Sequence, residues 1–450
     1  MSTWPRSAAS RLALLAGSLF LAAAGSASAD ELLAAVGDVG ATSAVVWVRG
    51  AGGGPVSIEL GERRIRLRPR EADDFTRKTL VTGLAPATRH RYRVIQGSDE
   101  TAGEFVTAPP PDVAAKVTFL WSGDLGGGGF CRLVDGGYRI FRPMARQGAD
   151  FFLFVGDTIY ADVPCDKPGV VRGAEFRART LPQFRARHRY NREDPGFKEF
   201  LKQMSVYAIW DDHEVRNDFS GTQDPLMPVG RRAFLEWWPI LPAEPDPTRL
   251  YRKFRWGSLL EMFILDTRQY RSANDAPDGP DKTMLGGPQR EWLLSEVSAS
   301  TASWKVIVSS VPLAIPTGRP ERRDSWTNAS VWGIPQEGGT GFVFERDRIL
   351  KALRDARVRN LVWVAADVHH AELIRHHPAA GYSFHEFIAG PLSATTGRPR
   401  PLDQSLGSRS LFARGGVYNF GEVVIESGRL TVRLIDDAGD VMFTHTLAAE

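Results

Sequence analysis

Four apolar stretches of the chain are followed by carboxylate or imidazole side chains, groups that bind metal ions in many proteins. The stretches are 117–122, 151–155, 206–210 and 361–366, and the polar residues that follow them are Asp124, Asp157, Asp211, Asp212, His213, Asp367 and His369. A single aspartate at a strand end is more often a turn former or a helix cap than a ligand. Several converging carboxylates are costly unless cations neutralise them, so the repetition predicts bound metal.

The donor types favour hard or borderline ions. Oxygen-rich ligation with one or two imidazoles suits iron, manganese or calcium, whereas zinc alone usually recruits more histidine or cysteine. The chain has only two cysteines, Cys131 and Cys165. In an oxidising compartment a disulfide between them competes with a metal-binding thiolate at Cys131, and the sequence leaves both open.

An α/β arrangement would bring these donors together. From about residue 112 onward, apolar strand-like stretches alternate with helical ones, which is typical of largely buried strands. Ligands in such folds bind at the carboxyl ends of the strands, where the polar residues lie. We expect a basic helical stretch at 176–200 with a break at Pro182, and alternating strands again at 417–447.

The preceding segment has a different pattern. Between residues 32 and 107, short β-forming runs are separated by glycine clusters, and residues 88–94 alternate with a period of two. We predict a small all-β sandwich domain over residues 30–108, which resembles fibronectin type III domains. The prolines at 109–111 interrupt regular structure, so the second domain is expected over residues 112–450.

The first 29 residues have the pattern of a secretory signal peptide. Arg6 and Arg11 precede an apolar stretch, and an Ala-Ser-Ala cleavage signature ends at Ala29. We therefore expect a periplasmic or secreted protein, exported by the general secretory route because the arginines are not adjacent. No later stretch is long and apolar enough to span a membrane.

The amino-acid composition and net charge exclude several classes of protein. With 43% hydrophobic and 24% charged residues, the chain is an ordinary folded globular sequence, which excludes disordered and fibrous classes. The formal charge of +3, from 56 basic and 53 acidic residues, argues against specific nucleic-acid binding.

Three motifs resemble the PhoD-like alkaline phosphatases and phosphodiesterases, a branch of the calcineurin-like metallophosphoesterases. They are Gly-Asp-Thr-Ile-Tyr-Ala-Asp at 156–162, Trp-Asp-Asp-His-Glu at 210–214 with Asn217 and Asp218, and Asp-Val-His-His-Ala-Glu at 367–372. The resemblance implies a four-layer α/β (α+β) catalytic domain of the metallophosphoesterase type, a β-sandwich flanked by helices, that follows the small fibronectin- or Ig-like β-sandwich.

The resemblance also implies a metal centre of Fe³⁺ and Ca²⁺, with manganese or zinc as alternatives. Asp157 would bridge the ions, and Tyr160 would bind ferric iron as a phenolate. Either Asp124 or Cys131 would take the place of the cysteine thiolate that binds iron in this family. The implied metal ligands are Asp124, Cys131, Asp157, Tyr160, Asp212, Asn217, Asp367 and His369.

The activity implied is hydrolysis of phosphate esters by a metal-bridging hydroxide, as in an alkaline phosphatase. His213 would stabilise developing charge or protonate the leaving oxygen, and Arg132 would contact the phosphate or form a surface salt bridge. Substrates would be small phosphate esters, or phospholipid or teichoic-type diesters in a phosphodiesterase or phospholipase D-type activity. The rival from another class is a non-catalytic extracellular calcium-binding adhesion protein.

Other polar residues receive structural interpretations. We expect His370, His376, His377 and His385 to be mostly loop or surface histidines, and Asp266 to pair with Arg268.

Overall fold

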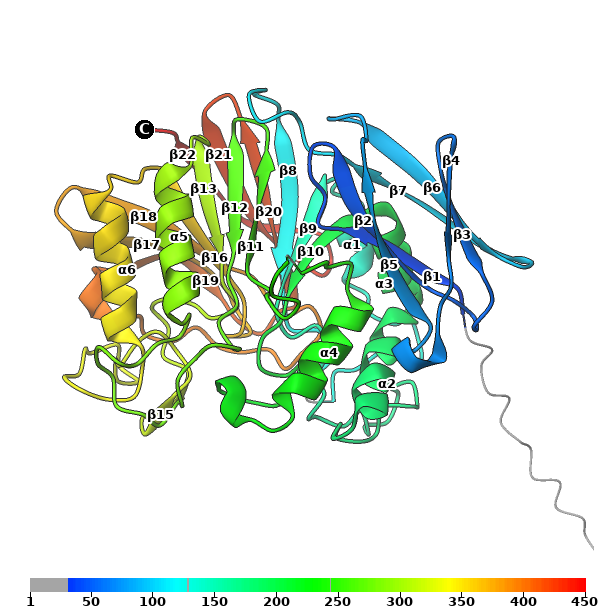
Figure 1. Ribbon diagram of the computed structural model, residues 1–450. Helices are drawn as coiled ribbons and strands as arrows, with labels where there is room; N and C mark the ends of the chain where they lie inside the picture. Colours follow the sequence, from blue (N-terminus) through cyan, green and yellow to red (C-terminus); the bar gives the residue numbers. More distant parts are fainter. Residues whose placement is uncertain (1–30, 128, 243) are drawn as a thin grey trace, which may run out of the picture.

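The computed structural model describes residues 31–127, 129–242 and 244–450 (Figure 1). The predicted signal peptide lies outside these residues. Two large sheets pack face to face, with helices on their outer sides. Mixed sheets with few helices agree with the architecture that the resemblance implies. None of the helices in the described ranges has the length and apolarity that crossing a bilayer requires.

The first sheet has nine strands, and its centre is parallel. β8, β9 and β10 lie side by side in parallel, and their residues are all buried. In spatial order the strands are β22 (Val441–Ala448), β21 (Arg429–Asp436), β20 (Asn419–Glu426), β8 (Val117–Ser122), β9 (Phe151–Val155), β10 (Ser205–Ile209), β1 (Leu33–Gly37), β2 (Ser43–Arg49) and β5 (Thr76–Thr82).

The second sheet has seven strands, and four neighbours within it are parallel: β12, β13, β16 and β18. In spatial order its strands are β11 (Arg252–Trp256), β12 (Leu260–Ile264), β13 (Trp304–Val308), β16 (Leu361–Ala365), β18 (Tyr382–Ile388), β17 (Ala371–Ala379) and β19 (Arg409–Arg414). A two-stranded hairpin, β14 (Gly318–Arg319) and β15 (Arg322–Arg323), follows β13.

Aromatic side chains fill the space between the two sheets. Phe151 of β9 lies 4.6 Å from Trp256 of β11, and Trp121 of β8 lies 6.1 Å from Phe387 of β18, measured between ring centroids. These large rings bury much apolar area, which is the main driving force for holding the layers together. Continuous apolar strands that are covered on both faces are expected of parallel sheets.

The described residues form six α-helices on the outer faces, with α5 and α6 beside the second sheet in Figure 1. They are α1 (Phe141–Ala145), α2 (Leu181–Arg192), α3 (Pro195–Gln203), α4 (Met227–Trp237), α5 (Gly287–Ala299) and α6 (Val343–Asp355). The sequence predicted a helix break at Pro182, and this prediction is wrong. Pro182 lies in the first turn of α2 after the Thr180 capping box, where a missing N–H costs nothing.

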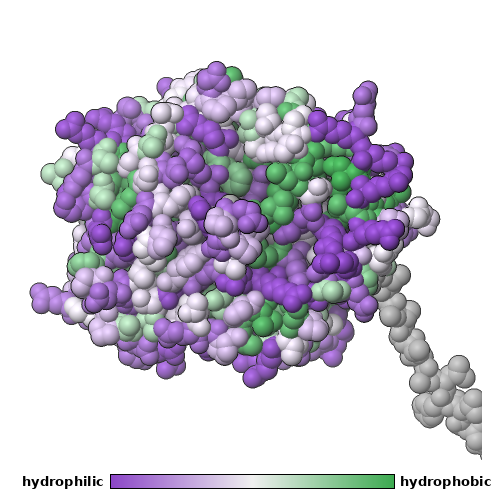
Figure 2. Space-filling model, viewed as in Figure 1, coloured by the Kyte–Doolittle hydropathy of each residue, from purple (hydrophilic) through white to green (hydrophobic). Residues whose placement is uncertain are grey.

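The N-terminal segment is all-β, but the small sandwich predicted for it is not confirmed as a separate unit. β1, β2 and β5 extend the nine-stranded sheet, because Gly37 at the end of β1 pairs in parallel with Val206 of β10. A separate four-stranded sheet is formed by β4 (Arg63–Leu67), β3 (Val56–Leu60), β6 (Arg89–Gln96) and β7 (Asp99–Val106). The predicted boundary between residues 108 and 112 stays a prediction. Figure 2 shows a mainly hydrophilic face whose largest hydrophobic area lies around β2 and β5.

Cys131 and Cys165 form a disulfide. The bond closes a loop with a sequence separation of 34, and this loop contains β9 and the residues that follow it. Both sulfurs are buried beside Tyr190 of α2. The disulfide therefore fixes the glycine-rich loop after β8 against the segment after β9.

The disulfide should stabilise the protein by constraining the unfolded chain. For a loop of this length, replacing both cysteines in a Cys131→Ser/Cys165→Ser variant should lower the free energy of unfolding by about 3 to 4 kcal/mol. Urea unfolding followed by circular dichroism measures this difference. If wild type and the double variant were equally stable in the presence of oxidant, the Cys131–Cys165 disulfide would not contribute to stability as predicted.

Candidate metal centre

Carboxylates at the carboxyl ends of four strands meet at one edge of the two sheets. Asp124, Asp157, Asp212 and Asp367 follow β8, β9, β10 and β16, respectively; the first three are buried and Asp367 is half-buried. Three groups of donors have atoms within 4.8 Å of one another: Asp124, Asp157 and His369; Asp157, Asp212 and His213; and Asp212, Asp218 and Asp324. Asp157 and Asp212 are shared between groups, so the three groups form one continuous chain of acidic side chains.

The backbone turns sharply at these strand ends. Asp124, Asp157, Asp367 and His369 have φ values of 65°, 50°, 66° and 58°, in the left-handed region that non-glycine residues rarely adopt. Residues in such conformations are strained and concentrate at functional sites, although aspartate tolerates the conformation better than most. Gly156 precedes Asp157 because a Cβ there would lie 2.6 Å from the Cβ of Asp211.

The electrostatics of the cluster favour a bound cation. Burial and the charges of Asp211 and Asp212 raise the pKa of Asp157 well above its ordinary range, and the pKa values of Asp124 and Asp367 are raised in the same way. One oxygen of Asp124 and one of Asp367 are buried and have no hydrogen-bond partner among the described residues. Unpaired, desolvated carboxylate oxygens fit hard metal ions.

Tyr160 and His369 add a phenol and an imidazole to the first group. The Oη of Tyr160 lies 2.9 Å from the Nε2 of His369. The Nδ1 of His369 is hydrogen-bonded to the Thr395 carbonyl, which leaves Nε2 as the atom that faces the cluster. The Tyr160 ring needs a glycine beside it, because a Cβ at Gly127 would lie 2.4 Å from a ring carbon. Both residues thus lie where the sequence analysis placed metal ligands.

His213 is held from two sides. Its Nδ1 lies 2.6 Å from the Oδ1 of Asp162, and its backbone N–H donates to Asp157. Burial opposes the charged form of the ring, but the charges of Asp212 and Asp162 outweigh it and raise the pKa of His213 to about 9. Asp162, which the sequence analysis did not assign to the site, therefore positions His213.

Arg268 is a buried cation beside the cluster, a place that the sequence analysis did not assign to it. Its Nε donates to Asp211 at 2.5 Å, and its two terminal nitrogens donate to both oxygens of Asp324, at 2.7 and 2.8 Å. The expected pairing with Asp266 is wrong, since that carboxylate accepts from the indole of Trp210 and from backbone N–H groups. A bidentate pair with zero side-chain exposure of the arginine is a strong, oriented interaction.

Asp218 and Asp324 extend the site beyond the predicted residues. Burial, with the charges of Asp324 and Asp212, raises the pKa of Asp218 to about 7. Asp324 lies in the segment after β15 and also accepts from Arg271 at 2.5 Å and Asn274 at 3.0 Å. Asp218 belongs to the motif at 210–218 that the sequence analysis described. Asp324 does not follow a long apolar stretch as the other aspartates do, so the sequence pattern did not indicate it.

Three predicted site residues lie outside the cluster. Cys131 cannot offer a thiolate, because its sulfur is bonded to Cys165, and Asp124 alone occupies the strand end. The Arg132 guanidinium donates to the Tyr190 carbonyl at 3.1 Å and lies over that tyrosine ring, since the disulfide holds this loop against α2. Asn217 is exposed, and only its backbone N–H is engaged, with Asp162.

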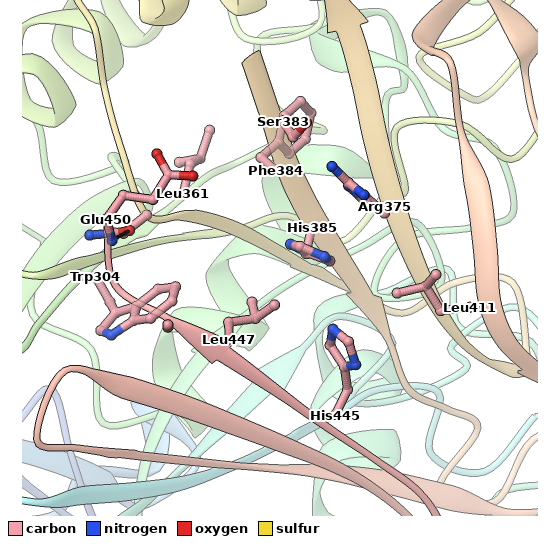
Figure 3. Close-up of a pocket in the computed structure, with 12 residues that line it drawn as sticks. Trp304, Leu361, Arg375, Ser383, Phe384, His385, Leu411, His445, Leu447 and Glu450 are labelled. Carbon is pink, nitrogen blue, oxygen red and sulfur yellow. Dashed lines mark hydrogen bonds between the residues drawn. The ribbon is translucent and has the colours of Figure 1, made fainter. Parts of the chain in front are cut away.

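The later histidines do not form a second metal site in the described chain. His370 and His376 are buried, not on the surface as expected, and pair with Glu372 at 2.9 Å and Glu386 at 3.0 Å. His385 lies beside His445 in a hollow of about 360 Å³ between the sheets (Figure 3). This hollow includes the amino-terminal ends of β13 and β16, so it lies at the opposite end of the strands from the carboxylates.

Arg268 should be essential for stability because it is buried among carboxylates. Replacing it in Arg268→Met leaves Asp211 without a cationic partner and Asp324 with Arg271 alone, which should cost about 3 to 5 kcal/mol of unfolding free energy. The exposed pair of Arg93 with Glu100 provides a matched control, for which Arg93→Met should cost at most about 1 kcal/mol. Urea unfolding compares the two. Similar losses for both variants would contradict the role of Arg268.

The chain is similar to known phosphatases in sequence and fold. A family model described as PhoD-like phosphatase matches residues 126–431. Alkaline phosphatase D of Bacillus subtilis strain 168 is 29% identical over 388 residues, which are 74% of this chain and 63% of that protein. The match thus spans less than two thirds of the relative's length.

Two solved structures share the fold. A structure titled "Structure of PhoD" superposes with a TM-score of 0.74 and 22% identity over 92% of this chain and 88% of that one. A purple acid phosphatase from yellow lupin (Lupinus luteus) seeds gives a TM-score of 0.64 and 11% identity over 93% of this chain and 74% of that one. The family match covers more than half of the sequence and includes most of the carboxylate cluster. The chain belongs to the PhoD-like phosphatase family.

Proposed function

We propose that this protein is a metal-dependent phosphoester hydrolase that acts at the carboxylate cluster. The observation that carries the proposal is the chain of three donor groups joined by Asp157 and Asp212, beside buried carboxylate oxygens of Asp124 and Asp367 for which the described part of the chain offers no hydrogen-bond partner. Family membership supports the same chemistry. The rival role as a calcium-binding adhesion protein explains neither the phenol of Tyr160 nor the imidazole of His213 at the cluster.

The donor sets suit two kinds of ion. Asp124, Asp157 and His369 with Tyr160 offer carboxylate, imidazole and phenol, which fits Fe³⁺, while the all-oxygen group of Asp212 and its neighbours fits Ca²⁺. Manganese or zinc are the alternatives. When bound, such cations supply positive charge that holds phosphoester oxygens and activates water for attack on phosphorus.

The protein's own residues orient the ester and supply a proton. Asp162 fixes Nδ1 of His213, so the other ring nitrogen is the one available to donate to a leaving oxygen. The charges of Asp212 and Asp162 raise the pKa of His213, which favours the protonated ring that a proton donor needs. Both monoesters and diesters fit this chemistry, so we propose an alkaline phosphatase with a phosphodiesterase or phospholipase D-type activity as the alternative.

We also propose that the protein is exported to the periplasm or secreted. The signal-peptide pattern of residues 1–29 supports this, and so does the Cys131–Cys165 disulfide, because disulfides persist mainly in oxidising compartments.

Removal of the shared carboxylate tests the hydrolase proposal. Asp157→Asn should lower kcat/KM on a chromogenic phosphate monoester, and on its matching diester, by about 10² to 10³-fold, since cation binding contributes several kcal/mol. Asp355→Asn, on the exposed face of α6, serves as the control and should be unchanged. Chelation should abolish activity, and returned iron and calcium should restore it. Activity that survives both chelation and the substitution would refute the proposal.

The carboxylate of Asp162 should set the alkaline limit of the reaction. In Asp162→Asn one charge that raises the pKa of His213 is lost, so the ring deprotonates at lower pH. The alkaline limb of the pH profile of kcat/KM should move to lower pH, while metal content stays the same. An unshifted limb would show that His213 is not the proton donor.

A further inference from the structure

A tight turn in the segment after β15 exposes three large apolar side chains. Trp332, Val331 and Ile334 are 72%, 63% and 55% exposed, and Trp332 is the most exposed large apolar residue in the described part of the chain. Tryptophan side chains are usually largely buried, because their big apolar rings gain much from leaving water. Exposed apolar side chains that gather in this way indicate a contact with a partner or a membrane.

The turn is a formed structure that holds these side chains outward. The N–H of Ser330 donates to the Ile334 carbonyl at 2.9 Å, and the N–H of Gly333 donates back to the Ser330 carbonyl at 2.9 Å. Gly333 is buried against Leu402, and its carbonyl accepts from the Gln404 N–H at 3.0 Å. These hydrogen bonds fix the backbone of the turn from which the exposed side chains extend.

Exposed arginines lie on the two segments that contact the turn. The β14–β15 hairpin braces it, since Arg323 donates to the Ala329 carbonyl at 2.8 Å and Thr340 to that of Pro320 at 2.9 Å. Exposed arginines lie on this hairpin and on the segment that leads to Leu402. They are Arg319, Arg322, Arg398 and Arg400, and none has a carboxylate within ion-pair distance among the described residues. The exposed acids nearby in sequence are Glu321 and Glu337, so the surface is positive on balance.

This surface adjoins the carboxylate cluster. Asp324, which pairs with Arg268, lies in the same segment as the turn, and the charge of Arg400 acts on His369. Gly397 bonds to the His369 carbonyl, which places the arginine-bearing segment at the rim of the site. Figure 1 shows the hairpin, labelled β15, at the lower edge of the molecule.

We propose that the turn 330–334 and the four exposed arginines form a docking surface for a lipid bilayer with anionic head groups. A small convex tip of tryptophan and aliphatic side chains fits the boundary between head groups and acyl chains, where tryptophan is enriched. Each arginine near an anionic surface adds to the attraction. Three side chains on a projecting turn offer far less area than the roughly 800 Å² per partner of a stable protein interface, which disfavours a second protein chain.

Docking would place the carboxylate cluster next to lipid head groups. This consequence rests on the proposed hydrolase function, and it identifies the substrate class as phosphoesters carried at a membrane surface. The docking surface itself does not depend on that function.

Sedimentation with lipid vesicles tests the surface. The mature protein without the predicted signal peptide, residues 30–450, should bind vesicles with about one third phosphatidylglycerol in phosphatidylcholine, and binding should fall steeply at high salt. Trp332→Ala should lower the partition coefficient about tenfold, because one large apolar side chain no longer enters the bilayer. Leu80→Ala removes an apolar side chain of 52% exposure from β5 and should bind as the wild type does.

Separate readouts distinguish the possible failures. Hydrolysis of a soluble chromogenic ester should be equal in Trp332→Ala and wild type, which shows that the variant is folded and tests the hydrolase proposal independently. Unchanged vesicle binding in Trp332→Ala, or no binding by the wild type, would overturn the docking proposal. Self-association of the wild type that disappears in Trp332→Ala, without vesicle binding, would instead identify a protein interface and equally overturn it.

Discussion

Repulsion among buried carboxylates is the constraint that the rest of the structure must satisfy. Asp124, Asp157 and Asp212 lie together with little access to water, and their charges cannot be screened there as they would be at the surface. Arg268 compensates one side of the cluster through Asp211 and Asp324. On the opposite side, where Tyr160 and His369 lie, no arginine or lysine pairs with the carboxylates among the described residues. His213, which stacks on Tyr160 at 4.1 Å between ring centroids, contributes positive charge there, and the proposed metal ions supply the rest.

The fold makes this crowding feasible. Parallel strands end at the same sheet edge, and the left-handed residues at those ends turn their side chains toward one another. Glu214 reinforces the arrangement, since it accepts from the Thr158 N–H and hydroxyl at 2.6 Å and from the Asp211 N–H at 2.9 Å. Backbone strain at the site is thus offset by hydrogen bonds from the following turns. The apolar layers between the sheets supply the rigid support.

Local patterns in the sequence were sufficient for the strands and for the acidic residues that directly follow them. Contacts between distant segments were not accessible in this way. Arg268 and Asp324 are 56 residues apart, and nothing local marks the second as a partner of the first. The pairing of β1 with β10, which joins the N-terminal strands to the main sheet, is equally remote. The pairing of His376 with Glu386 joins the neighbouring strands β17 and β18, and the sequence pattern of either strand alone does not reveal it.

Thermal unfolding of the chelator-stripped protein tests the central claim most directly. The raised pKa values of Asp124, Asp157 and Asp367 mean that the metal-free fold gains stability from bound protons, and this contribution is lost as the pH rises through those values. The stripped protein should therefore melt at a lower temperature at about pH 8 than at about pH 5.5, and returned iron and calcium should raise the midpoint more at the higher pH. A midpoint that does not respond to the ions at either pH would contradict the account.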